Sequence, residues 1–78
     1  MICEVLKRYR AENGLSVEGL ASKMEIPVET VREYERVETA QEAHYLFFPW
    51  SDALKIMKLT GCTLLELLAY PETENETT

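Results

Sequence analysis

The sequence contains few of the residue types on which enzymatic and metal chemistry depend. Its 78 residues include one histidine, two cysteines and three glycines. These residues provide neither a cluster of metal ligands, nor a glycine-rich phosphate loop, nor a nucleophile set among paired carboxylates. We therefore expect a protein that is not an enzyme and that uses no metal ion and no cofactor.

Long hydrophobic runs are also missing. No stretch approaches the roughly 18 apolar residues of a membrane-spanning helix. The first residues mix charged with aliphatic side chains and lack the apolar region of an export signal. We expect a cytoplasmic protein without membrane contact, in which Cys3 and Cys62 are small core residues and form no disulfide.

The sequence has fewer basic than acidic residues: eight Lys and Arg and 14 Asp and Glu, which give a net charge of −6. A basic chain would have suggested a nucleic-acid partner, and this charge balance does not. Half of the excess negative charge lies in residues 71–78, which contain no apolar side chain. We expect this segment to be a disordered acidic tail and residues 1–70 to form one domain.

Helical periodicity dominates the first part of the chain. One face of a first helix is apolar at positions spaced for helical packing, namely Ile2, Val5, Leu6 and Tyr9. Gly14 suits the left-handed residue that follows a helix, and Ser16 is placed to cap a second helix over about 16–23. Pro27 predicts the first position of a third helix, over about 27–36.

The second half predicts two more helices. Ser51 is placed to cap a fourth helix, whose apolar stripe would consist of Ala53, Leu54, Met57 and also Ile56, and Gly61 would end it. Thr63 and Glu66 have the spacing of a capping box before a short leucine-rich fifth helix. No strand pattern competes, so the predicted fold is all-α, with five helices and an insertion over about 37–50, after the third helix.

The second and third predicted helices, joined by a turn of about three residues, have the pattern of a helix-turn-helix. Several motifs resemble the Xre/Cro phage-repressor-type, or lambda-repressor-like, DNA-binding domain: Leu6-Lys7-x-x-Arg10, Gly14-Leu15-Ser16-x-x-x-Leu20-Ala21, Ile26-Pro27-Val28-x-Thr30-Val31-Arg32, Tyr34-Glu35-Arg36 and Leu64-x-Glu66-Leu67-Leu68. The resemblance covers residues 2–70 apart from the insertion. It implies that the third helix enters the major groove of DNA as part of a dimer.

The resemblance also implies roles for individual residues. Arg10 and Glu35 would form a structural ion pair that holds the third helix in place. The DNA-facing positions would be Val17, Pro27, Val28, Glu29, Thr30, Arg32, Glu33 and Arg36. Lys23 is a further cation available for phosphates.

The chain departs from the family pattern at two positions of the helix-turn-helix, and two of its DNA-facing residues are acidic. Val17 stands where the family usually has a glutamine that steadies a phosphate. Glu25 stands where the family favours glycine, and a left-handed glutamate there costs roughly 1 kcal/mol. The carboxylates of Glu29 and Glu33 would be repelled by nearby phosphates, although a carboxylate can accept a hydrogen bond from cytosine.

The insertion is rich in aromatic residues, and two interpretations of it stay open. Tyr45, Phe47, Phe48 and Trp50 either fold over the core of a small domain or form a surface for a partner. The predicted function is a small bacterial or phage-type transcriptional regulator that binds double-stranded DNA as a homodimer. The alternative is a helix-turn-helix-derived module that binds a protein through the insertion, in the manner of an anti-repressor, an antitoxin-like partner or a sigma-factor accessory.

Overall fold

The computed structural model describes residues 1–43 and 46–69, and these residues form α-helices and no strand. The helices are α1 (Ile2–Asn13), α2 (Val17–Met24), α3 (Val28–Arg36), α4 (Ala40–Ala43), α5 (Trp50–Thr60) and α6 (Leu64–Leu68). The all-α prediction is confirmed. The described helices number six and not five, because the insertion forms α4, a single helical turn. The tail expected over 71–78 lies outside the described residues.

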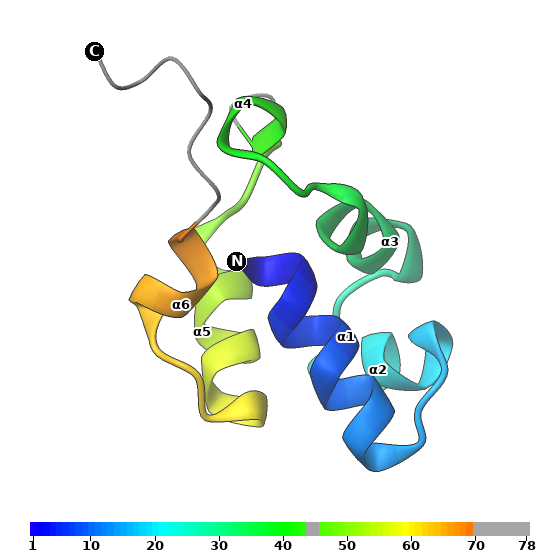
Figure 1. Cartoon of the computed structure of the whole chain (residues 1–78). Coiled ribbons are helices and arrows are strands. Elements are labelled where there is room, and N and C mark those ends of the chain that lie inside the picture. Colours follow the sequence, from blue (N-terminus) through cyan, green and yellow to red (C-terminus); the bar gives the residue numbers. More distant parts are fainter. Residues whose placement is uncertain (44–45, 70–78) are drawn as a thin grey trace, which may run out of the picture.

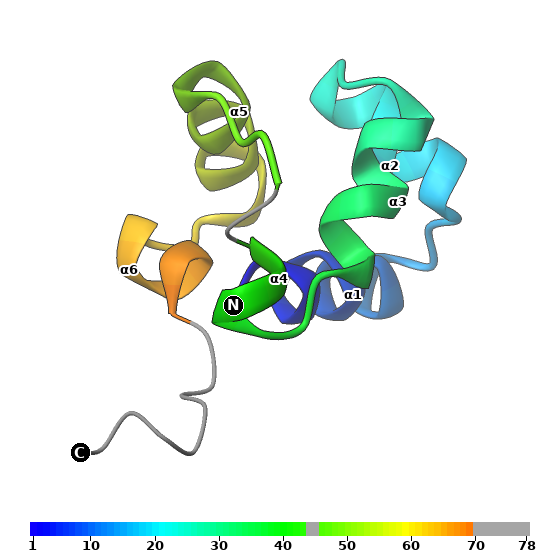
Figure 2. The same cartoon turned by 90° about the horizontal axis from the view of Figure 1, so that it is seen from above.

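Helix α1 lies at the centre of the arrangement (Figure 1). It contacts α3 on one side and α5 and α6 on the other, while α2 packs against both α3 and α5. Figure 2 shows the same two groups from above, with the α2–α3 pair on the right and α5 and α6 on the left. None of the helices in the described residues is long and apolar enough to cross a membrane.

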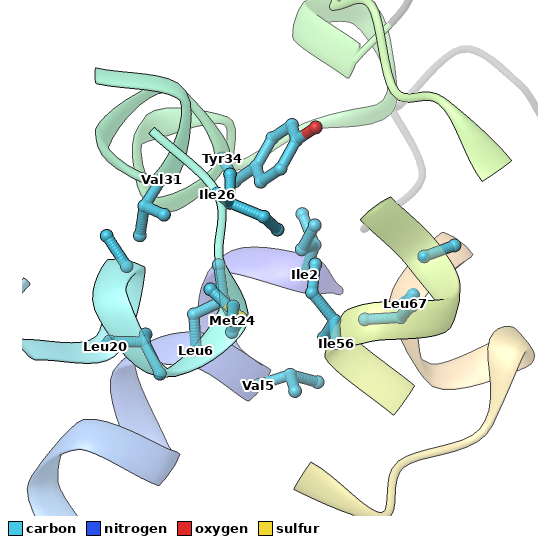
Figure 3. Packing of buried hydrophobic residues seen from close by; sticks show 12 residues of the cluster. Ile2, Val5, Leu6, Leu20, Met24, Ile26, Val31, Tyr34, Ile56 and Leu67 are labelled. Atoms are coloured by element: carbon cyan, nitrogen blue, oxygen red, sulfur yellow. The ribbon is translucent and has the colours of Figure 1, made fainter. Parts of the chain in front are cut away.

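One hydrophobic core joins these helices, and Figure 3 shows its side chains pointing toward one another. Its fully buried members come from five helices: Ile2, Leu6, Leu20, Val31, Tyr34, Ile56 and Leu67. Leu54, expected in the buried stripe of its helix, is instead 47% exposed. The buried face of α5 follows Ala53 and Ile56, and the next position along the helix turns about 100° away from Ala53 toward solvent.

The turns on both sides of α2 form as local rules predict. Gly14 ends α1 in the left-handed conformation with φ 61°, and the Ser16 hydroxyl accepts a hydrogen bond from the Gly19 N–H at 3.0 Å. Glu25 ends α2 with φ 59° and ψ 42°, so the expected left-handed glutamate is present. The Ile26 N–H then donates to the Ala21 carbonyl at 3.1 Å, which closes the α2 terminus.

Two helix starts differ from the prediction. Pro27 precedes α3 as its N-cap, with ψ 144°, and is not the first helical residue. Pro49 occupies the corresponding position before α5, so Ser51 lies inside that helix and does not cap it. In both cases the proline carbonyl accepts the first helical hydrogen bonds, and the fixed φ of proline suits this boundary. The capping box of Thr63 and Glu66 is confirmed.

Both cysteines are free, as expected. Cys3 is buried on α1, and burial raises the pKa of its thiol, while Cys62 is partly buried after α5.

Candidate nucleic-acid interface

A bidentate ion pair joins α1 to α3. Nε of Arg10 donates to Oε2 of Glu35, and Nη2 of Arg10 donates to Oε1, both at 2.9 Å. The side chain of Glu35 is 10% exposed and that of Arg10 is 28% exposed. The hydrogen bonds from Arg10 to Glu35 raise the pKa of the guanidinium. This pair, implied by the resemblance, fixes how α3 lies against α1, because two parallel hydrogen bonds set orientation as well as distance.

Four basic side chains converge on one groove beside this pair. The cationic groove, as we call it, lies between α1, α2 and α3 and is lined by Lys7, Arg10, Val17, Arg32, Glu35 and Arg36. Glu35 is the carboxylate among these residues, and Arg10 neutralises it. Lys7, Arg32 and Arg36 are the remaining charges of the lining, and each of them pairs with a carboxylate outside it. Exposed cations of this kind can neutralise phosphates once those pairs open.

Three of these cations form ion pairs with exposed carboxylates that do not line the groove. Nη2 of Arg32 pairs with Oε2 of Glu18 at 2.7 Å, and Arg36 pairs with Glu33 one helical turn earlier. Nζ of Lys7 lies 3.9 Å from Oε2 of Glu38, which belongs to the insertion. Exposed ion pairs of this kind contribute at most about 1 kcal/mol each. Since each partner is accessible, a phosphate can replace the carboxylate without unfolding any element.

The outer face of α3 carries most of the residues predicted to face DNA. Glu29, Arg32, Glu33 and Arg36 are exposed on α3, and Pro27 is exposed just before it. Thr30 is partly buried.

Two predicted residues are less exposed than the resemblance implies, and a third lies away from the cationic groove. Val17 and Val28 are partly buried and pack against the core. Lys23 is exposed but lies in a different groove, together with Glu25, Lys55 and Lys58. The structure therefore brings Arg32 and Arg36 together with α1 and leaves Lys23 apart from them.

A second groove lies on another face of α3 and has a different character. The aromatic groove, as we call it, is lined by Thr30, Glu33, Tyr34, Leu46, Phe47, Pro49 and Asp52. At its base, the Tyr34 hydroxyl donates to Oδ2 of Asp52 at 2.5 Å, which ties α3 to α5. Burial, together with this hydrogen bond, raises the pKa of Tyr34.

The aromatic residues of the insertion divide between core and solvent. Phe48 packs edge-to-face on Tyr34, with ring centroids 5.1 Å apart and an interplanar angle of 74°. Phe47 is 81% exposed and Trp50 is 58% exposed. Tyr45 lies outside the described residues. Phe48 thus follows the core interpretation, whereas Phe47 and Trp50 remain available to a partner.

Within the described residues, no group of three or more His, Cys, Asp or Glu side chains is arranged to hold a metal ion. Comparisons with protein-family models, with curated proteins and with solved structures give no match for this chain. Function is therefore inferred from the residues and their geometry.

Proposed function

We propose that the chain is a helix-turn-helix DNA-binding domain of the Xre/Cro type that regulates transcription, with α3 as its recognition helix. The observation that carries this proposal is the convergence of Lys7, Arg10, Arg32 and Arg36 on the cationic groove. Support comes also from the short turn between α2 and α3 and from the ion pair that fixes α3 against α1. Together these features present one helix beside a set of phosphate-binding cations.

The groove and the outer face of α3 have separate roles in this proposal. Lys7, Arg32 and Arg36 neutralise backbone phosphates after leaving their carboxylate partners, while Arg10 stays with Glu35. Glu29, exposed on the outer face of α3, then faces base edges in the major groove, where a carboxylate can accept hydrogen bonds. About three neutralised phosphates give a logarithmic salt slope of about −3 and weak, micromolar or weaker, non-specific affinity.

Fluorescence anisotropy of a labelled random duplex at about 50 mM salt tests this proposal, since non-specific binding needs no known operator. Arg32→Ala and Arg36→Ala are each expected to weaken binding and to lower the salt slope by about 1. Lys58→Ala is the matched control, because it removes one exposed cation outside the cationic groove. Absence of binding at low salt, or equal weakening by all three variants, would overturn the proposal.

A second function is favoured by the exposure of Phe47 and Trp50. Aromatic side chains are enriched at the centres of protein interfaces. Phe47 lines the aromatic groove, Trp50 follows the lining residue Pro49, and neither is part of the core. A protein-binding role for the insertion is compatible with DNA binding, because the two grooves use different faces of α3.

A further inference from the structure

The aromatic groove is acidic as well as apolar. Among the described residues, its lining includes the carboxylates of Glu33 and Asp52 and no Lys or Arg side chain. The cationic groove, on another face of the same helix, is lined by four basic side chains and one carboxylate, that of Glu35. The two linings on this nine-residue helix thus differ in charge, and the pair of Glu33 and Arg36 joins them.

Exposed aromatic residues extend this surface. Phe47 lines the groove, and Trp50 follows Pro49 at the start of α5. Phe48, which lies between them in the sequence, packs on Tyr34 and anchors this segment to α3. Phe47 and Trp50 therefore stand on a supported segment and can be contacted without rearrangement of the core.

We propose that the aromatic groove together with Trp50 docks a basic segment of a protein partner. Arginine side chains of that segment reach Glu33 and Asp52, and their planar guanidinium groups and apolar neighbours pack on Phe47 and Trp50. The proposal rests on the protein-binding role suggested above and does not require that the chain bind DNA. Glu33 pairs with Arg36 in the folded chain, so an arginine of the partner replaces Arg36 at this exposed carboxylate.

Charge disfavours two other occupants of this surface. A nucleic-acid backbone would bring phosphates against Glu33 and Asp52. A second copy of the chain, meeting the first through the same patch, would bring the two carboxylates of one copy against those of the other. A basic segment alone combines opposite charge with the apolar stems that Phe47 and Trp50 favour.

The intrinsic fluorescence of the protein gives a direct readout, because Trp50 is the sole tryptophan. The probe is an amidated peptide of alternating Arg and Leu, compared with the same peptide carrying Glu in place of Arg, at physiological salt. We expect the Arg peptide to cause a saturable change in the wavelength or intensity of the Trp50 emission, and the Glu peptide to cause none. Phe47→Ser and Glu33→Gln are each expected to weaken binding by about fivefold or more.

Two matched variants control for non-specific hydrophobic binding and for the change in net charge. Leu68→Ser removes another exposed apolar side chain, on α6, and Glu12→Gln removes another exposed carboxylate, on α1; both should leave the affinity unchanged. Because Phe47 is largely exposed, Phe47→Ser should keep the helical circular dichroism of the wild type.

Four outcomes would overturn the proposal. The first is the absence of a saturable signal with the Arg peptide, and the second is equal binding of both peptides. The third is a wild-type dimer in sedimentation that Phe47→Ser dissociates, which would assign the surface to a second copy. The fourth is a loss of duplex affinity in Phe47→Ser as large as that in Arg36→Ala, which would assign it to DNA. Failure of the DNA proposal shows instead in Arg32→Ala and Arg36→Ala and leaves the peptide result intact.

Discussion

Replacing Glu35 by glutamine is expected to destabilise the fold by about 2 kcal/mol, because it leaves the Arg10 guanidinium charged and without its carboxylate. Breaking a fully buried pair costs about 3–5 kcal/mol, and an exposed pair contributes at most about 1 kcal/mol. The side chains of Arg10 and Glu35 are 28% and 10% exposed, which places this pair between those limits. In a domain of this size the midpoint of thermal unfolding should fall by roughly 8–16 °C.

Urea unfolding of Arg10→Gln, Glu35→Gln and the double variant measures the coupling. Each single variant should lose about 2 kcal/mol, and the double variant about the same, because removing the second charge also removes the unpaired group left by the first. Glu12→Gln, an exposed change on the same helix, should stay within about 0.5 kcal/mol of the wild type. Single losses below about 0.5 kcal/mol, or losses that add in the double variant, would refute a structural role for the pair.

Three further changes test the local structure. Glu25→Gly should stabilise the fold by about 0.5–1 kcal/mol in urea unfolding, because glycine adopts the left-handed conformation at φ 59° without strain; a loss of stability would show that the glutamate side chain is needed there. Gly19→Ala should stabilise α2 by up to about 1 kcal/mol, because alanine has a higher helix propensity than glycine. The new Cβ has room, since it would lie 3.4 Å from Ser16 Oγ and 3.5 Å from the nearest Leu15 atom; destabilisation would mean that this contact is too tight. Burial and the hydrogen bond to Asp52 raise the pKa of Tyr34, so the folded state keeps a proton that the unfolded state loses above pH of about 10. Stability should therefore fall above that pH by up to about 1.4 kcal/mol per unit, and unfolding measured between pH 9 and 11 should lose this component in Tyr34→Phe; an unchanged slope would contradict it.

The fold was predictable where a residue acts on its own neighbours. Gly14, Ser16 and the Thr63–Glu66 capping box each satisfy backbone groups within a few residues, so their spacing is sufficient to place a helix end. Ser51 was assigned wrongly because Pro49, two residues earlier, offers an equally good helix start. Sequence alone does not decide between two possible helix starts that lie two residues apart, and here the packing of α5 selects one of them.

The candidate site was predictable only in part, because its charges are paired over long distances. Glu18 and Glu38 hold Arg32 and Lys7, yet each lies on another element, and no spacing rule connects such partners. The split of the insertion's aromatic residues between core and solvent has a local cause, which the assumption of helical spacing does not predict. Leu46 and Phe48 pack against the core while Phe47 between them is exposed, which is the alternation of a non-helical segment.

Glu33 belongs to both proposed functions, and its position limits how strongly they can interact. It pairs with Arg36 of the cationic groove and also lines the aromatic groove. A phosphate that takes Arg36 releases Glu33 for a partner's guanidinium, and a guanidinium at Glu33 releases Arg36 for a phosphate. Thermodynamic linkage makes these two effects equal, so the ligands assist each other by the same factor. Because an exposed pair contributes at most about 1 kcal/mol, that factor is at most about fivefold, which makes Glu33 a modest link between two separable binding surfaces.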